Sequence, residues 1–159
     1  MNQTLDVAAM EPTLELVTMS LGGHAFGVAV RQVHDILGPQ PVAAVPLACE
    51  AVAGSINLRG RIVTVLDLAV VLGIDRQTDT SRALNVVVAD DKELYALMVD
   101  NVGDVLTLQN RALEPLPPTF PAGWKAISNG IVKLADQLLL TLEPERILAA
   151  IKAQTSKQA

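Results

Sequence analysis

The sequence repeats one order of features twice, and this repeat constrains the fold more than any single motif does. Residues 26–37 (FGVAVRQVHDIL) align with residues 95–106 (YALMVDNVGDVL), and residues 54–72 align with residues 130–148 at a slightly larger offset. Each half contains a strand, an aspartate-bearing strand, a proline-rich loop, a glycine-led hairpin, an acidic residue and a short helix. A shared order of this kind predicts an internal duplication.

The expected elements are short strands separated by glycine and proline turn signals. Gly22-Gly23 and Gly60 fit hairpin turns, because glycine adopts positive φ without steric cost. Asp67 and Gly73 fit the two ends of a helix over residues 68–72, and Pro144 fits the first residue of a helix ending near Ile151. About ten short strands and two short helices indicate an all-β barrel or sandwich.

The repeat also predicts how the chain is divided. Halves of about 60 to 70 residues bury too little surface to be stable alone, so they are expected to pack together along an apolar seam. The expected divisions are a flexible arm over residues 1–12, a duplicated domain over 13–152 with two intertwined barrels at about 14–74 and 83–152, and a flexible tail over 153–159.

Composition excludes several classes of protein. Half of the residues are hydrophobic and 18% are charged, which is unlike a disordered chain. A net charge of −5 and only 3% aromatic residues argue against nucleic-acid binding. No apolar stretch is long enough to span a membrane, and no signal peptide is evident. A single cysteine cannot form an internal disulfide, so a reducing cytoplasm is the expected location.

Residues that could support catalysis or metal binding are few. Cys49 with His34 could act as nucleophile and base, but a small apolar side chain in a loop and a surface histidine explain them better. The acidic turn Asp90-Asp91 with Glu93 lacks the spacing of a calcium loop. Asp35 and Asp104 correspond in the repeat and are expected to be separate edge residues rather than a catalytic pair. We therefore expect no enzyme activity, no cofactor and no metal.

The remaining candidates lie on the surface. Arg59 is expected at a hairpin tip, where an unpaired guanidinium could bind a partner carboxylate or carbonyl groups, or simply aid solubility. Period-two alternation predicts that Val33 and Asp35 lie on the same face of one strand. An apolar and a charged side chain together on an exposed strand suit a protein contact.

These segments resemble the CheW family of bacterial chemotaxis coupling proteins. The resemblance is carried by FGVAVRQVHDIL at residues 26–37, Val45-Pro46, GSINLRGRIVTVLDL at residues 54–68 and LMVDNVGDVL at residues 97–106. It implies two five-stranded SH3-like barrels packed together, with a short helix after the second hairpin of each half. It also implies a non-enzymatic adaptor that links the cytoplasmic tip of a methyl-accepting chemoreceptor to the regulatory domain of the histidine kinase CheA.

The resemblance also assigns roles to individual residues. It implies receptor and kinase coupling for Val33, Asp35 and Arg59. It implies that Leu84, Val102 and Val105 line the groove that receives the receptor tip. Gly54 and Gly60 match glycines near the kinase-facing surface, although their backbone role could be the whole explanation. The implied location is the cytoplasm, with recruitment to membrane-bound receptor arrays.

Two other interpretations remain open on the sequence. The same fold could serve a chemosensory pathway other than chemotaxis, such as twitching, gliding or development. The chain could instead be a small-molecule-binding β-barrel or an enzyme that uses Asp35, Cys49 or His34. The second interpretation is less favoured, because the predicted strands lack the convergent polar groups that ligand pockets need.

Overall fold

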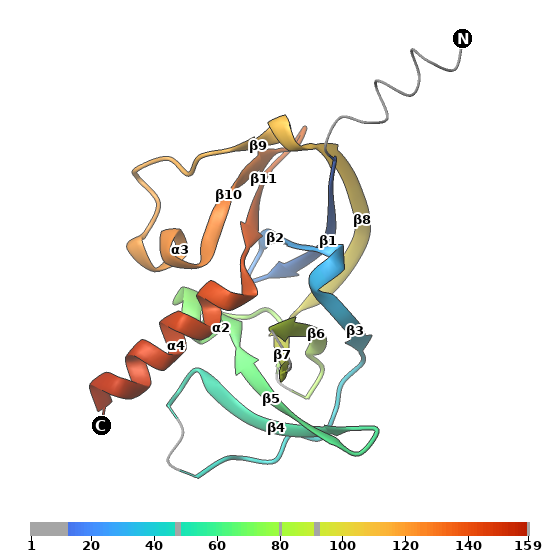
Figure 1. Cartoon of the computed structure of the whole chain (residues 1–159), viewed down its shortest axis with the longest axis vertical. Coiled ribbons are helices and arrows are strands. Elements are labelled where there is room, and N and C mark those ends of the chain that lie inside the picture. The colour runs from blue at the N-terminus through green and yellow to red at the C-terminus, as the bar shows by residue number, and fades with distance from the viewer. Residues whose placement is uncertain (1–12, 47–48, 80, 91–92, 159) are drawn as a thin grey trace.

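Two β-sheets form most of the molecule (Figure 1). The structure is a computed structural model that describes residues 13–46, 49–79, 81–90 and 93–158. The arm expected over residues 1–12 therefore lies outside the described residues. In the part that is described, no helix is long and apolar enough to cross a membrane.

Sheet A has six strands and sheet B has five. Sheet A has the order β8-β1-β2-β11-β10-β9, and sheet B has the order β3-β6-β7-β5-β4. The strands of sheet A are β1 (Thr13–Leu21), β2 (His24–Ala29), β8 (Asn101–Gln109), β9 (Leu113–Glu114), β10 (Ser128–Lys133) and β11 (Leu138–Leu142). The strands of sheet B are β3 (Val33–Leu37), β4 (Val52–Leu58), β5 (Arg61–Asp67), β6 (Leu84–Asp90) and β7 (Glu93–Val99).

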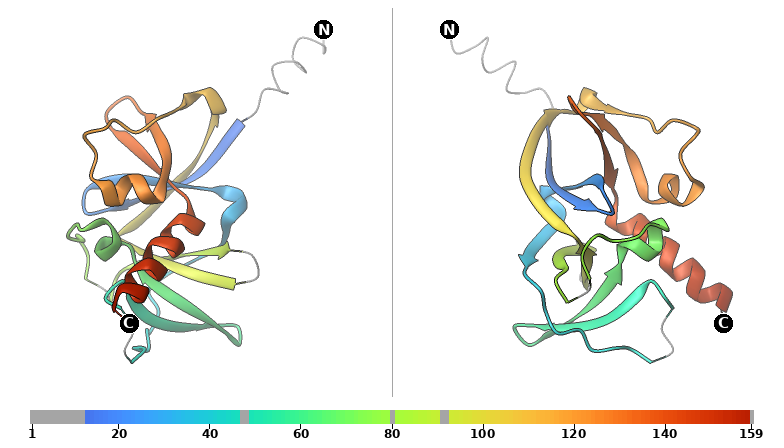
Figure 2. Two further views of the ribbon diagram at one scale, coloured as in Figure 1. Left: turned by 60° about the vertical axis from the view of Figure 1, so that its left-hand side comes forward. Right: turned by 180° about the vertical axis from the view of Figure 1, so that it is seen from behind.

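The sheets do not follow the two halves of the sequence. Strands β1 and β2 of the first half join β8–β11 of the second half, while β6 and β7 join β3–β5. The chain crosses from sheet A to sheet B through the 3-10 turn Val30–Gln32 and returns at Asp100, between β7 and β8. Figure 2 shows the molecule from two further sides. Parallel pairs, β2 with β11 and β5 with β7, join the exchanged strands.

The residue correspondences of the repeat recur in the strand pairing. Thr64 pairs with Tyr95 in sheet B, and the corresponding residues Leu140 and Phe26 pair in sheet A. Strand β4 is irregular between Val52 and Gly54, and β10 is irregular at the corresponding positions, Ser128 to Gly130. The two sheets are therefore built on one plan, in which β3 corresponds to β8, β6 to β1 and β7 to β2.

The α-helices of the described residues follow from local sequence and from packing. Helix α2 (Leu68–Leu72) begins where the Asp67 carboxylate accepts a hydrogen bond from the Ala69 N–H, and it ends at left-handed Gly73, as predicted. Helix α4 (Pro144–Gln158) runs beyond the predicted end near Ile151 and through the expected flexible tail. The predicted end of the helix was wrong, because the helical backbone continues past Ile151 although Lys152 and Ala153 are exposed.

Helix α3 (Ala122–Ile127) was not predicted, because its sequence AGWKAI is short and contains glycine. Tertiary contacts stabilise it. The Trp124 indole N–H donates to the Leu72 carbonyl oxygen at 2.8 Å, and its ring lies edge-on to the rings of His24 and Phe120. Helix α3 is thereby fixed to the end of α2.

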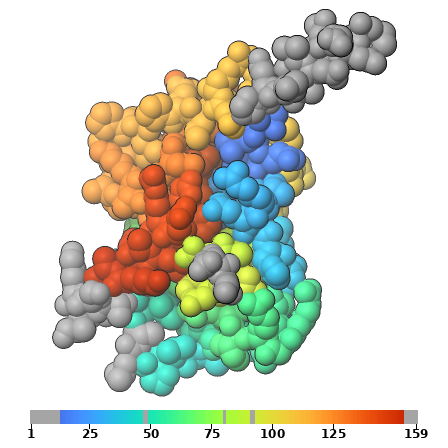
Figure 3. All heavy atoms as spheres, viewed as in Figure 1, coloured from blue at the N-terminus to red at the C-terminus, as the bar shows by residue number. Residues whose placement is uncertain are grey.

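The main hydrophobic core lies between the two sheets and combines side chains from both. Met19, Phe26 and Val28 enter it from sheet A, and Val86 and Leu97 enter it from sheet B. Helix α4 packs against this core through Ile147, Leu148 and Ile151, and its atoms lie across the front of the molecule in Figure 3. Each curved sheet also encloses a smaller hydrophobic core of its own, separate from the main core.

Candidate functional site

Arg59 and Asp35 form an ion pair on the surface of sheet B. The Arg59 Nη2 atom lies 2.9 Å from Asp35 Oδ2, and the Arg59 side chain is 75% exposed. Strands β3 and β4 are the two edges of sheet B, so the pair links one edge to the β4–β5 hairpin tip. The prediction that Arg59 carries an unpaired guanidinium was therefore wrong. Sheet curvature, which sequence alone does not show, brings the two edges together.

The hairpin tip that carries Arg59 is a two-residue turn with positive φ at both positions. Arg59 has a φ of 51° and Gly60 has a φ of 87°, while Leu58 and Arg61 pair on either side. This is the pattern of a type I′ turn, which matches the twist of the flanking strands. The Asn57 side-chain oxygen accepts a hydrogen bond from the Gly60 N–H at 2.8 Å. The turn therefore holds Arg59 at the tip facing Asp35.

A bulge in β3 places Val33 and Asp35 on opposite faces of sheet B. Val33 pairs with Val88, whose side chain lies in the core between the sheets, but Asp35 pairs with Val87, which lies in the core inside sheet B. Residues paired across strands share a face. The prediction of one shared face was wrong because a bulge adds a residue and breaks the period of two.

Strand β8 carries a bulge at the corresponding place in sheet A. Val102 pairs with Met19 and Val105 pairs with Val17, so two residues of β8 lie opposite the single residue Thr18 of β1. Met19 and Val17 both belong to the core between the sheets. Val102 and Val105 therefore lie on the same face of sheet A, although simple alternation would separate them.

Ile36 is a site residue that the sequence analysis missed. It pairs with Val86, which faces the core between the sheets, and its side chain is 44% exposed. Ile36 corresponds to Val105 in the repeat, and that correspondence could have identified it. With Ile36 included, five apolar side chains border the space between the sheets along edge strands β3 and β8 and the start of β6. We call them the inter-sheet strip; they are Val33, Ile36, Leu84, Val102 and Val105.

Burial differs along the inter-sheet strip. Val33, Leu84 and Val102 are half-buried and pack against the main core, whereas Val105 is 54% exposed. The buried parts of these side chains contribute to folding, and the exposed parts are accessible to solvent. The exposed part of the strip is apolar surface of the kind that marks a protein contact.

The two predicted glycines have different backbone roles. Gly54 is buried with a φ of 153°, and a Cβ atom there would lie 2.2 Å from the Ala43 carbonyl oxygen. Gly60 is exposed, and a Cβ atom there would meet no other atom within 4 Å. Close approach of the chain therefore requires glycine at Gly54, whereas turn geometry favours it at Gly60.

The candidates for catalysis do not assemble into an active site in the described residues. Cys49 is buried in the main core, while His34 is exposed on β3. In the described part of the chain, no group of three or more histidine, cysteine, aspartate or glutamate residues could hold a metal ion. Asp91 of the acidic turn lies outside the described residues.

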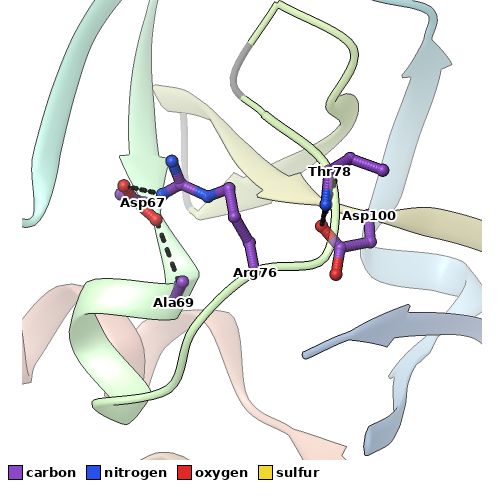
Figure 4. A network of polar contacts seen from close by, with 5 residues as sticks. All are labelled: Asp67, Ala69, Arg76, Thr78 and Asp100. Atoms are coloured by element: carbon purple, nitrogen blue, oxygen red, sulfur yellow. Dashed lines mark hydrogen bonds and ion pairs between the residues drawn. The ribbon is translucent and has the colours of Figure 1, made fainter. Parts of the chain in front are cut away.

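The linker between the halves is fixed by two carboxylates (Figure 4). The Asp67 carboxylate accepts a hydrogen bond from the Arg76 guanidinium, and the two groups form an ion pair. Asp100, at the crossover from β7 to β8, accepts the backbone N–H groups of Gln77 and Thr78 and the Thr78 hydroxyl, at 2.8–3.1 Å. It also accepts the Gly22 N–H of the β1–β2 turn at 2.8 Å.

These hydrogen bonds determine the charge state of Asp100. Burial by itself raises the pKa of this carboxyl group, but the hydrogen bonds from Gln77, Gly22 and Thr78 outweigh burial and lower the pKa below 3.8. Asp100 is therefore ionised at neutral pH, and it ties the linker to both sheets.

Comparison with known proteins places this geometry in a family. Residues 15–152 match the CheW-like domain. The chain is 27% identical to the probable chemotaxis protein CheW of Rhizobium etli, covering 89% of this chain and 92% of the relative. It is 29% identical to the chemotaxis protein CheW of Thermotoga maritima, covering 86% of this chain and 89% of the relative.

A solved structure shows the same arrangement of strands. The chain superimposes on the crystal structure of the scaffolding protein TtCheW from Thermoanaerobacter tengcongensis with a TM-score of 0.73. The match has 27% sequence identity and covers 82% of this chain and 88% of the other. This similarity confirms the predicted all-β fold of two packed SH3-like units.

Proposed function

We propose that this chain, which belongs to the CheW family, couples methyl-accepting chemoreceptors to the histidine kinase CheA. As a member of that family it is a chemotaxis scaffold and not an enzyme. The proposed coupling takes place in the cytoplasm, where the chain is recruited to membrane-bound receptor arrays. The observation that carries the proposal is the inter-sheet strip.

The inter-sheet strip suits the apolar face of a partner helix. Val105 and Ile36 are 54% and 44% exposed and lie on edge strands of the two sheets, so a helix placed between these edges would cover both. Helix-in-groove recognition uses apolar side chains spaced three and four residues apart on the helix. The proposed occupant is the helical cytoplasmic tip of the chemoreceptor.

The Asp35–Arg59 pair suits the kinase contact or the border of the receptor contact. Arg59 is 75% exposed, and its planar guanidinium can bind a second carboxylate or carbonyl while it remains paired with Asp35. Exposed charges at the border of an interface determine register and association rate more than affinity. The apolar strip would then supply most of the binding energy, and the ion pair would fix orientation.

Substitution of Val105 tests the proposal. Val105→Lys places a charge on the exposed part of the strip, and we expect it to weaken binding of a chemoreceptor cytoplasmic fragment at least tenfold. The matched control is Val45→Lys, because Val45 is 43% exposed and lies outside the strip. Binding is measured by titration calorimetry, with the CheA regulatory domain as the second partner.

Two results would count against the proposal. Wild-type protein that binds neither the receptor fragment nor the kinase domain would contradict the coupling role itself. Equal receptor affinity for Val105→Lys and Val45→Lys would show that the strip is not the receptor site. Circular dichroism of both variants checks that the fold is retained.

A further inference from the structure

Sheet A has a pocket at the place where sheet B has the Asp35–Arg59 pair. Asp104 of β8 corresponds to Asp35 in the repeat, and Ala135 of the β10–β11 turn corresponds to Arg59. The pocket measures about 370 Å³. Asp104 and Gly103 of β8 line one side of it, and Leu134 and Gln137 of the β10–β11 turn line another.

Smaller residues leave this pocket open. Gly103 occupies the position of His34 in sheet B, and Ala135 occupies the position of Arg59. Glycine at position 103, in place of a histidine, has a structural reason. A Cβ atom there would lie 2.7 Å from the Thr18 hydroxyl oxygen. That hydroxyl donates to the Asp104 carbonyl oxygen at 2.6 Å and holds the bulge in place.

The Asp104 carboxylate lacks the cation that its counterpart has. Within the described residues, Asp104 takes part in none of the ion pairs, and its side chain is exposed. It is the one carboxylate among the residues that line the pocket, and no described lysine or arginine lines it. The remaining polar lining consists of hydrogen-bonding groups from Thr18, Ser20, His24, Asn101 and Gln137. Such a lining fits a planar cation with several N–H donors.

We propose that this pocket receives an arginine side chain from a partner protein, in the place that Arg59 fills in sheet B. The partner's guanidinium would pair with Asp104 as Arg59 pairs with Asp35 at 2.9 Å. The stem of that arginine would pack against the apolar lining, which includes Leu106, Leu134 and Leu139. The inference rests on the proposed adaptor role, because it assigns a side-chain type to one of the partners.

Two substitutions test the proposal from opposite directions. Asp104→Asn removes the charge, and Ala135→Arg supplies the missing cation from within the chain and fills the pocket. We expect each to weaken binding of the chemoreceptor fragment or of the CheA regulatory domain at least fivefold at low salt, with a smaller effect at 0.5 M NaCl. Asp136→Asn is the matched control, because Asp136 is an exposed carboxylate in the same turn and does not line the pocket.

A second measurement does not depend on either partner. Asp104→Asn and Ala135→Arg are combined in a double-mutant cycle of thermal unfolding. If the pocket accepts a guanidinium, Ala135→Arg raises Tm by about 1–3 °C more when Asp104 is present than when Asn replaces it. The cycle tests directly whether an arginine at this place recognises Asp104.

The outcomes separate failure of this inference from failure of the proposed function. Wild-type protein that binds neither partner contradicts the coupling role, and the double-mutant cycle then decides the inference by itself. Affinities of Asp104→Asn and Ala135→Arg within twofold of wild type, for every partner that wild type binds, overturn the inference and leave the coupling role intact. An absence of coupling in the cycle also overturns the inference.

Discussion

Replacement of Asp100 by asparagine is the sharpest test of how the two sheets are held together. In the wild-type protein Oδ2 accepts the N–H groups of Gly22 and Gln77, and Oδ1 accepts the N–H and the hydroxyl of Thr78. Asparagine keeps the shape of aspartate but replaces one of these oxygens with an NH₂ group. Two donors therefore lose their acceptor, whichever oxygen is replaced.

The expected loss of stability follows from these contacts. Hydrogen bonds to a charged group contribute about 1.5 kcal/mol or more each, so two lost bonds cost about 3 kcal/mol. With a urea m-value of about 2 kcal/mol/M, the unfolding midpoint falls by about 1.5 M. Asp75→Asn is the control; Asp75 is exposed in the same linker, and we expect its replacement to cost less than about 0.5 kcal/mol.

The dependence on pH gives a second readout of the same contact. Because the pKa of Asp100 is lowered in the folded state, its contribution to stability is fully present above the unfolded value of 3.8. That contribution is lost as the pH falls through the still lower folded pKa. The stability difference between wild type and Asp100→Asn should therefore be constant from pH 7 to pH 5 and narrow between pH 4 and pH 2.

Urea unfolding followed by circular dichroism measures both effects. A difference below about 0.5 kcal/mol between wild type and Asp100→Asn at pH 7 would refute the role assigned to these hydrogen bonds. A difference that stays constant down to pH 2 would refute the assignment of the pH dependence to this carboxylate.

Three further substitutions test the two glycine positions and the ion pair of sheet B. Gly54→Ala places a Cβ atom 2.2 Å from the Ala43 carbonyl oxygen and should destabilise the protein by about 2 kcal/mol or more. The Cβ atom of Gly60→Ala meets no atom within 4 Å, so this substitution should cost only about 1 kcal/mol for its positive φ. Equal losses in thermal unfolding would contradict this distinction. Arg59→Ala should weaken partner binding and change stability by less than about 1 kcal/mol, because the ion pair that it removes is largely exposed. An unfolded Arg59→Ala variant would show that the ion pair has a structural role.

Local features of the fold were predictable from the sequence because they depend on neighbouring residues. The limits of helix α2 follow from the Asp67 cap and from Gly73, which has a φ of 69° in the left-handed region. The predicted turn at Gly22-Gly23 is the β1–β2 turn of the structure, and both glycines have positive φ. Helix α3 was missed because its stability comes from Trp124 and its contact with Leu72, which lies 52 residues away.

The candidate site was predictable in its residues but not in its geometry. Asp35 and Arg59 were identified separately, and only the curvature of sheet B shows that they pair. Ile36 was missed because simple alternation gives no sign of the bulge in β3. The role of Val105 in binding a partner stays a prediction, and its 54% exposure makes it the residue to test first.

The sequence alone determined the order of strands and turns, the caps of helix α2 and the match between the halves. Each of these depends on residues close in the chain. Tertiary structure alone decided which strands the halves exchange: β2 pairs with β11 and β5 pairs with β7. Burying a core between two sheets requires surfaces that neither short half can supply by itself. The same exchange places the edge strands β3 and β8 beside one core, and the inter-sheet strip results from that arrangement.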